Sequence, residues 1–304
     1  MNRVGRLAFG LFLAILSVAG FASTFVFGAA LTKLQGVSPL VLTFLRFLIA
    51  GLILFVAGCC RPAERTRFFS LSRKDWLKMV WVAPIGTFLM AWSVFMGCAR
   101  VSAANASMAD ALTPLMIFVV SAFHVRHIEL KELIGLAFGF VGALLVIQIL
   151  TGSGFHLSAY SVGDCYVLLA AATWGVYTVF GRGMVARMGS WAFSAWSMLI
   201  GAAVAAAFLP FGDFDWPTTV KGWGLVLGLG FCGTLLPFLM WNAAQRYLPM
   251  SVLGISAYFT PVFAVWFAAL FLDESATLLQ WVGVLFIAIS AIVETGRTRG
   301  RRGC

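Results

Sequence analysis

Long apolar runs without charge constrain this chain more than any other feature. The runs Leu7–Ala30 and Trp223–Met240 contain no Asp, Glu, Lys or Arg. About 20 apolar residues, each rising ~1.5 Å along a helix, cross a hydrocarbon core of ~30 Å. The sequence therefore predicts an all-α membrane protein with ten transmembrane helices, at 7–30, 38–58, 77–98, 102–122, 132–150, 162–183, 190–209, 221–243, 251–271 and 278–295. Most connections are short, and the longer ones are Cys59–Trp76, Thr151–Ser161 and Pro210–Val220.

The composition agrees with a chain that lies mostly in lipid. Hydrophobic residues make up 62% and charged residues 11% of the 304 residues, whereas soluble domains carry about 25% charge. A net charge of +10 would suggest nucleic acid in a soluble chain, but no basic–aromatic motif accompanies it, so we predict no nucleic-acid partner. The 6 cysteines and 3 histidines lack metal-ligand spacing, and no phosphate-binding glycine loop occurs. We predict no metal, no cofactor and no direct use of ATP.

The basic residues indicate the orientation. With the N-terminus in the cytoplasm, all 21 Lys and Arg fall on the cytoplasmic side except Lys33, Arg100 and Lys221 outside and Arg46 within the membrane. The positive-inside rule requires such an asymmetry. We predict a multi-pass protein of the plasma membrane, in a prokaryote the inner membrane, with both termini in the cytoplasm.

The second half of the chain repeats the first. Arg100 is followed by a small-residue helix and then Thr113-Pro114, and Arg246 is followed by a small-residue helix and then Thr260-Pro261. We predict one five-helix repeat over 1–150 and a second over 151–304, the latter ending in a basic cytoplasmic tail. Five is an odd number, so the two copies must lie in opposite orientations. Inverted repeats that meet at the midplane are typical of alternating-access transporters.

These features resemble the EamA-type permeases of the drug/metabolite transporter superfamily, which have ten helices in two five-helix copies. The segments that carry the resemblance are Ser38-Pro39, Leu45-Arg46-Phe47, Arg100 to Pro114, Trp174-Gly175, Arg246 to Pro261, Leu272-Asp273-Glu274 and Leu279-Gln280-Trp281-Val282-Gly283. The first copy departs at its turn, where Val125-Arg126-His127 replaces the acidic pair. The resemblance implies export or exchange of small metabolites, often amino acids.

Asp110 and Arg46 are the charged residues that we place within helices. A carboxylate at bilayer depth is costly, so Asp110 should face the bundle interior and have a partner. It shares a small or polar stripe with Ala103, Ser107 and Pro114. Arg46 lies at the same depth, roughly 12 Å below the outer boundary, so we predict an Arg46–Asp110 ion pair. Asp110 is also a candidate for binding the substrate amine or carrying protons. The alternatives are a structural, hydrogen-bonded Asp110 and an Arg46 that snorkels to the outer interface.

Further residues are candidates for the wall of a central cavity or for hinges. Aromatic rings and hydroxyls near helix centres give the candidate cavity Thr24, Trp92, Ser107, Asp110, Trp174, Tyr177, Trp241 and Tyr258. Prolines within central helices give the candidate hinges Pro84, Pro114, Pro237 and Pro261. The alternatives are packing between helices, rings at the lipid interface, and prolines that only shape the bundle.

The sequence thus predicts a secondary transporter that moves small organic solutes by alternating access and exports amino acids or related metabolites. Its partners are a small-molecule substrate and the lipid bilayer. A passive facilitator would share every one of these features. An intramembrane prenyl or acyl transferase is a further alternative, but it would need clustered Asp or His for its chemistry, so we predict that the protein is not an enzyme. The substrate, the coupling ion and the oligomeric state stay open.

Overall fold

The computed structural model describes residues 3–100, 112–125, 134–141, 162–212 and 214–260, with isolated positions between 262 and 290. Within these residues the chain forms helices and turns and no strand. Five helical segments are long and apolar enough to cross a membrane: Gly5–Leu34, Pro39–Cys59, Arg73–Arg100, Cys165–Phe211 and Val220–Ala244. The described residues therefore confirm an all-α fold with helices of membrane-spanning length and composition. The total of ten helices stays a prediction, because much of the predicted fourth, fifth, ninth and tenth helices lies outside the described residues.

Helix α9 (Val162–Phe208) contains two of the predicted helices. Its backbone is interrupted at Gly189, where φ is 84° and ψ is 161°. Glycine adopts such a left-handed φ without the steric cost that a Cβ would add. The interruption lies between the predicted helices at 162–183 and 190–209, so the segment divides where the sequence placed a connection.

Three of the long segments contain a π-helical stretch. Helix α1 (Arg3–Ala29) continues into η1 (Ala30–Leu34). Helix α4 (Arg73–Pro84) continues through η2 (Ile85–Leu89) into α5 (Met90–Arg100). Helix α10 (Val220–Gly230) continues through η5 (Phe231–Leu235) into α11 (Leu236–Ala244). Such π-bulges widen one turn and often occur at functional sites.

The stretches η2 and η5 have similar sequences and similar roles. Each contains a Gly-Thr pair, Gly86-Thr87 and Gly233-Thr234, separated along the chain as Thr113-Pro114 is from Thr260-Pro261. The Thr87 hydroxyl bonds to the Ser197 carbonyl at 3.2 Å, so it joins the first half of the chain to the second. Thr234 accepts a hydrogen bond from Arg46 at 2.9 Å, which joins the second half to the first. The two contacts are reciprocal.

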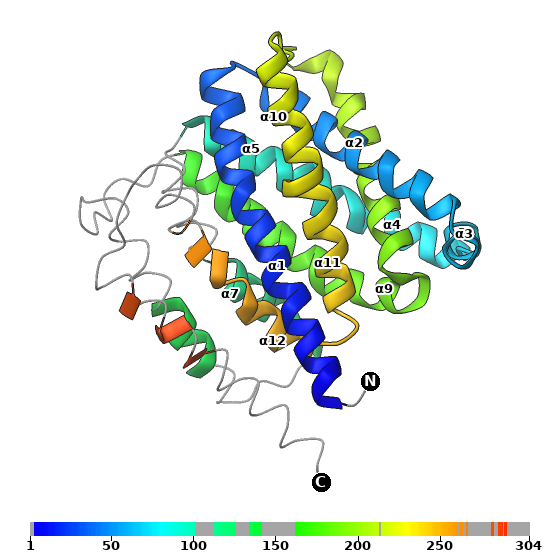
Figure 1. Cartoon of the computed structure of the whole chain (residues 1–304), viewed down its shortest axis with the longest axis vertical. Coiled ribbons are helices and arrows are strands. Elements are labelled where there is room, and N and C mark those ends of the chain that lie inside the picture. The colour runs from blue at the N-terminus through cyan, green and yellow to red at the C-terminus, as the bar shows by residue number, and fades with distance from the viewer. Residues whose placement is uncertain are drawn as a thin grey trace.

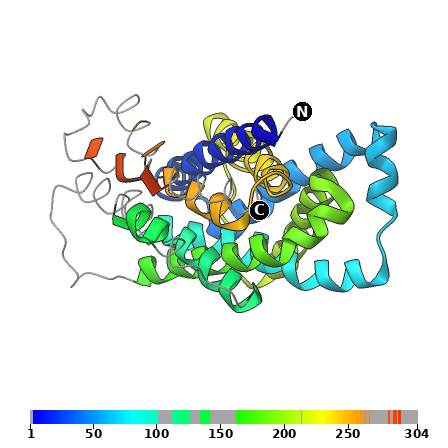
Figure 2. The ribbon, with the colours of Figure 1, turned by 90° about the horizontal axis from the view of Figure 1, so that it is seen from below.

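The predicted Cys59–Trp76 connection contains a helix that the sequence pattern does not indicate. Helix α3 (Pro62–Phe69) follows α2 (Pro39–Cys59) after a short turn. Proline at its first position and Glu64 in its first turn favour a helix start. Phe68 is fully buried, and its carbonyl accepts a hydrogen bond from Trp196 Nε1 at 3.1 Å. In the view from below, α3 lies at one edge of the bundle (Figure 2).

Helices α1 and α11 run side by side along the long axis of the molecule (Figure 1). The Ser17 hydroxyl donates to the Pro237 carbonyl at 2.7 Å. A Cβ on Gly20 would come within 2.4 Å of the Pro237 ring, so glycine permits this close approach. Two shorter helices, α7 (Thr113–Val125) and α12 (Met250–Ser256), pack on each other and on α9 and α1 respectively.

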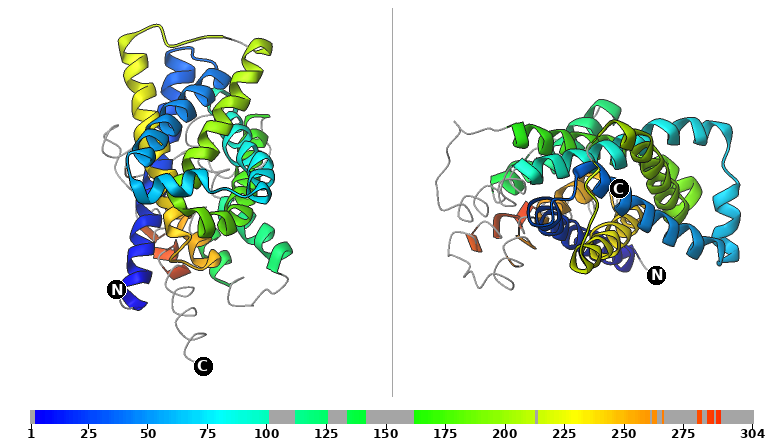
Figure 3. Two further views of the ribbon diagram at one scale, coloured as in Figure 1. Left: turned by 90° about the vertical axis from the view of Figure 1, so that its right-hand side faces the viewer. Right: turned by 90° about the horizontal axis from the view of Figure 1, so that it is seen from above.

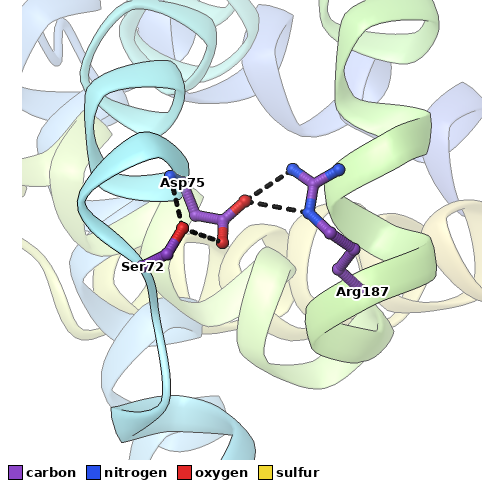
Figure 4. A network of polar contacts seen from close by, with 3 residues as sticks. All are labelled: Ser72, Asp75 and Arg187. Carbon is purple, nitrogen blue, oxygen red and sulfur yellow. Dashed lines mark hydrogen bonds and ion pairs between the residues drawn. The ribbon is translucent and has the colours of Figure 1, made fainter.

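Connections that the predicted topology puts on one side of the membrane also meet at one end of the bundle. At the predicted outer end, Ser38 N–H bonds to the Asp215 carbonyl at 3.1 Å and Thr219 bonds to Gln35 at 2.6 Å, where the α9–α10 connection passes over the α1–α2 turn (Figure 3). At the predicted inner end, Arg187 Nε bonds to Asp75 at 2.9 Å beside the N-cap Ser72 (Figure 4).

Candidate functional site

Arg46 is a cation enclosed in the middle of the bundle. It lies on α2, and only 1% of its surface is exposed. Its Nε–H donates to the Thr234 hydroxyl at 2.9 Å, and Nη2 donates to the Gly233 carbonyl at 3.2 Å. The guanidinium carbon is 4.9 Å from the ring centre of Phe47 and 5.3 Å from that of Phe95. Arg46 therefore points inward and does not snorkel, since its contacts are with helix η5 and with buried rings.

The π-helical stretch η5 supplies the acceptors for this cation. The residue four positions after Gly233 is Pro237, which has no N–H to donate to the Gly233 carbonyl. That carbonyl accepts from both Arg46 and the Thr24 hydroxyl, the latter at 3.0 Å. The Thr234 hydroxyl in turn donates to the Leu229 carbonyl at 2.8 Å. The bonds fix the guanidinium from one side, and both acceptors are neutral.

A cavity of about 60 Å³ opens beside Arg46. A buried water needs roughly 10–15 Å³ of such space, so the cavity has room for about four waters in this conformation. Its wall combines residues from α1, α2, α5, α7, α9 and α11 with two that follow α12. The lining residues are Val18, Phe21, Thr24, Phe25, Arg46, Met90, Val94, Thr113, Ala170, Trp174, Trp241, Ala257 and Thr260. Arg46 is the charged residue of a wall that is otherwise apolar, aromatic or hydroxyl-bearing.

Two tryptophans form an aromatic wall of this cavity. The rings of Trp174 and Trp241 are tilted against each other with centroids 5.7 Å apart. Phe21 meets both edge-on, at 5.1 Å and 6.3 Å. Trp241 Nε1 donates to the Thr178 hydroxyl at 3.1 Å, which satisfies its polar group and fixes the ring. Of the predicted cavity residues, the structure thus brings together Thr24, Trp174 and Trp241, with Arg46 beside them.

Tyr177 lies behind this wall. Its ring stacks on Trp174 with centroids 5.2 Å apart, and its hydroxyl accepts a hydrogen bond from Asn242 Nδ2 at 3.1 Å. Asn242 also donates to Ser194 at 2.8 Å and accepts from Gln245 Nε2 at 2.9 Å. This buried polar network positions Trp174 from the side away from the cavity. The sequence signal for it was the Asn242 and Gln245 pair, three residues apart on one helix face.

Two other residues predicted to line the cavity, Trp92 and Tyr258, lie elsewhere in the bundle. Trp92 is half-buried and meets Tyr166 edge-on at 5.5 Å. Tyr258 is fully buried and donates its hydroxyl to the Leu136 carbonyl at 3.0 Å, in a small apolar cluster with Ile255 and Ile287. Neither side chain is in the wall of the cavity beside Arg46. Ser107, Asp110 and Pro261 lie outside the described residues.

The candidate hinge prolines adjoin irregular helix geometry. Pro84 is the last residue of α4 and directly precedes η2, and Pro237 follows η5 by two residues. Pro114 is the second residue of α7, a position where its missing N–H has no intrahelical partner to lose. Pro84 and Pro237 therefore lie where the α-helical ladder is already interrupted.

The Arg46–Asp110 pair stays a prediction, because Asp110 is outside the described residues. Among the residues that are described, the ion pairs are Arg67–Glu64 and Arg187–Asp75, and no carboxylate lies within 4.0 Å of the Arg46 guanidinium. Among the described residues, the charge of Arg46 is therefore stabilised by dipoles and aromatic faces and is not neutralised. Such a buried cation favours an anionic partner, since an unpaired charge in a low dielectric is costly.

The family of the chain follows from its sequence over nearly the whole length. The sequence model of the EamA-like transporter family matches residues 8–148 and 161–295. The chain belongs to the EamA-like transporter family. The resemblance stated above to EamA-type permeases of the drug/metabolite transporter superfamily is thereby confirmed, and the membrane-transporter class with it.

Individual relatives of this EamA-like transporter have low sequence identity to it, but they match it over most of its length. The uncharacterized transporter YetK of Bacillus subtilis (strain 168) is 26% identical over 247 residues, which cover 79% of this chain and 73% of YetK. The aromatic amino acid exporter YddG of Ancylobacter novellus is 26% identical over 235 residues, which cover 77% of this chain and 79% of YddG. A crystal structure with 24% identity has a TM-score of 0.77 over 98% of this chain and 99% of that chain, and supports the fold.

Proposed function

We propose that this EamA-like transporter is a secondary transporter that exports small carboxylate-bearing solutes with an apolar side chain, aromatic amino acids in particular. The observation that carries the proposal is Arg46, a fully buried cation in the wall of a cavity formed otherwise by aromatic, apolar and hydroxyl side chains. A carboxylate would neutralise this cation, and a guanidinium binds carboxylates strongly through paired N–H donors.

The aromatic wall fits the other end of such a solute. Phe21, Trp174 and Trp241 present ring faces and edges to the cavity, and aromatic pairs favour offset or edge-to-face contact. The relative YddG is named an aromatic amino acid exporter, which supports the same substrate class. The cavity of about 60 Å³ is too small for an aromatic amino acid, so this conformation corresponds to a closed state that must open for binding.

The mechanism that we propose is alternating access between two inverted five-helix repeats, 1–150 and 151–304, with ten helices in all. The reciprocal contacts of the two Gly-Thr stretches support this arrangement. Thr87 of the first half bonds to Ser197, and Thr234 of the second half bonds to Arg46. Rocking of one repeat against the other would change both contacts together, with Pro84, Pro114, Pro237 and Pro261 as hinge candidates.

We propose that Asp110 contributes a carboxylate to the same site. It would bind the substrate amine or carry the coupling proton, or pair with Arg46 when no substrate is bound. Ser107, Trp92 and Tyr258 stay candidates for the cavity in its open conformation. We propose no metal and no cofactor, and no catalytic role for any of these residues.

The proposed orientation puts both termini in the cytoplasm of a prokaryotic cell, with the protein in the inner membrane. Arg67 and Arg246 line one groove at the end of the bundle opposite to Lys33 and Lys221, which supports this orientation. One relative, YicL of Salmonella typhimurium, is named an uncharacterized inner membrane transporter and is 24% identical over 266 residues.

The experiment is uptake into proteoliposomes of defined composition. Labelled phenylalanine, tyrosine and tryptophan are compared with glutamate, lysine and an amphipathic cation such as tetraphenylphosphonium. Saturable uptake of the aromatic amino acids, and none of glutamate, is expected. Accumulation above the external concentration when a proton gradient is imposed would distinguish a coupled transporter from a passive facilitator. Uptake of the cation alone would contradict the proposal.

A further inference from the structure

A second and larger hollow lies at the opposite side of α11 from Trp241. It has a volume of about 400 Å³, within the ~300–1,000 Å³ range of small-molecule sites. We call it the inner-end groove, and it is lined by Phe9, Leu13, Glu64, Arg67, Ser190, Trp191, Leu239, Met240, Ala243, Arg246 and Tyr247. The groove is bounded by α1 and α11 on one side and by α3 and the bend of α9 on the other. The cavity beside Arg46 shares no lining residue with it.

The lining changes from charged to apolar with depth in the membrane. Phe9 and Tyr247 are level with each other, because their rings meet edge-on at 5.4 Å. Four residues along a helix advance it by ~6 Å. Leu13 is therefore ~6 Å deeper than Phe9 along α1. Ala243 and Leu239 are ~6 and ~12 Å deeper than Tyr247 along α11. The charged residues lie at the shallow end, the one that the predicted topology puts toward the cytoplasm, because Arg246 precedes Tyr247 and the Arg67–Glu64 pair packs on the bend of α9. The exposed side chains of Phe12 and Leu16 continue the apolar surface along α1.

The shallow end has an excess of positive charge. Glu64 Oε1 pairs with Arg67 Nη1 at 2.9 Å, so these two charges balance. Arg246 is exposed, and within the described part of the chain it has no carboxylate within ion-pair distance. The guanidinium of Arg61 lies 4.4 Å from the ring centre of Trp191 and adds a further cation at the rim. Trp191 and Tyr247 are amphipathic rings of the kind that lie at the headgroup level of a bilayer.

We infer that the inner-end groove binds one anionic phospholipid, with the phosphate held by Arg246 and Arg61 and an acyl chain along Leu13, Leu239 and Phe12. The order of groups along the groove complements that of a phospholipid. Cations and amphipathic rings lie at the level of the headgroup, and apolar side chains lie at the level of the acyl chains. Basic pockets between transmembrane helices at the membrane surface bind anionic headgroups in this way. The inference does not depend on the transported substrate.

A lipid in this groove would also hold the bend of α9. A Cβ on Gly189 would lie 3.3 Å from Arg67 Nη1 and 3.7 Å from Glu64 Oε2, so the Glu64–Arg67 pair packs directly on the bend. The headgroup would connect α3 and the bend, which pack on each other, to the end of α11 across the groove. Binding should stabilise the folded protein through this added contact.

The test uses the purified full-length protein and compares phosphatidylglycerol with phosphatidylcholine. Native mass spectrometry counts the lipid molecules that stay bound, and the melting temperature is recorded as each lipid is added. We expect one phosphatidylglycerol to be retained in preference to phosphatidylcholine and to raise the melting temperature. Arg246→Gln and Arg61→Gln should each weaken retention about fivefold, since one cation near a membrane surface contributes ~1 kcal/mol. Arg246→Lys should retain the lipid.

The control is Arg65→Gln, which removes an equal charge from α3 at an exposed position outside the groove. Equal loss with Arg65→Gln would overturn the inference, because it would reduce the effect to general surface charge. Equal retention of the two lipids by the unaltered protein would also overturn it. A shift in melting temperature with phenylalanine that Arg246→Gln abolishes, without any shift with phosphatidylglycerol, would identify the groove as a solute site instead.

Discussion

Arg46 on α2 donates a hydrogen bond from Nε to the hydroxyl of Thr234 in η5, over a distance of 2.9 Å. The bond joins the two halves of the chain beside the cavity. Both groups are buried, since Arg46 is 1% and Thr234 is 0% exposed. A buried donor that loses its acceptor keeps the full cost of its desolvation, so this contact should be sensitive to changes on either side.

Thr234→Val should destabilise the protein by about 1.5–3 kcal/mol, because it removes the acceptor of a charged donor while keeping the shape of the side chain. Thr234→Ser keeps the hydroxyl and should cost under about 1.5 kcal/mol. Thermal unfolding in detergent, followed by size-exclusion chromatography, measures both. Equal melting temperatures for the valine and serine variants would show that the bond contributes nothing to stability.

Gly86→Ala should destabilise the protein by about 1–3 kcal/mol through overpacking. A Cβ at this position would come within 2.2 Å of Tyr177, which is itself fully buried. The matched control is Gly224→Ala on α10, where no heavy atom lies within 4 Å of the added carbon. Alanine there should be neutral or stabilising, since it favours the helix more than glycine does. The same thermal assay compares the two variants.

The orientation can be tested with single cysteines at two exposed positions, Thr66 of α3 and Thr218 before α10. The native cysteines are first replaced, because Cys60, Cys165 and Cys232 are exposed. A membrane-impermeant maleimide added to intact cells should label Thr218→Cys and leave Thr66→Cys unmodified. Permeabilised cells provide the control, and both positions should react there. Labelling of only Thr66→Cys in intact cells would show that the topology is the reverse of the predicted one.

The predicted Arg46–Asp110 pair is tested by a double-mutant cycle. Asp110→Asn and Arg46→Gln should each impair folding, because each leaves one charge buried alone. If the two side chains pair, the double variant should be less damaged than the sum of the single ones, with a coupling of about 0.5–3 kcal/mol. Additive losses of melting temperature would argue against pairing. Normal expression and stability but no transport in Asp110→Asn alone would instead assign Asp110 to the binding of substrate or protons.

The long helices were predictable from sequence because lipid requires uncharged runs of fixed length. The runs at 7–30, 38–58, 77–98 and 221–243 correspond to described helical segments, and the connection between 183 and 190 coincides with Gly189. Helix α3 was missed, since eight residues of mixed polarity carry no periodic signal of their own. The π-helical stretches were missed because an apolar run has the same composition in either type of helix.

The site was predictable in part. Thr24, Trp174 and Trp241 could be chosen because polar or amphipathic groups near a helix centre tend to face the bundle interior. The partners of Arg46 could not, since Gly233 and Thr234 lie on a distant helix and the Gly233 acceptor is a backbone carbonyl. Tyr258 had the same signal as the tryptophans, yet its hydroxyl is bonded to the Leu136 carbonyl. The direction in which a side chain points depends on helix packing, which the sequence pattern does not specify.

The most direct test of the proposed site compares phenylalanine with phenethylamine, which lacks only the carboxylate. Each is measured as inhibitor and as substrate of uptake into proteoliposomes, for the unaltered protein, Arg46→Lys and Arg46→Gln. If Arg46 binds the carboxylate, the unaltered protein should prefer phenylalanine by roughly 10-fold or more, as a charge-assisted bond of about 1.5–3 kcal/mol implies. The folded fraction of Arg46→Gln, isolated by size-exclusion chromatography, should lose this preference while it still interacts with phenethylamine, and Arg46→Lys should keep part of it. An unchanged preference in Arg46→Gln would contradict the account.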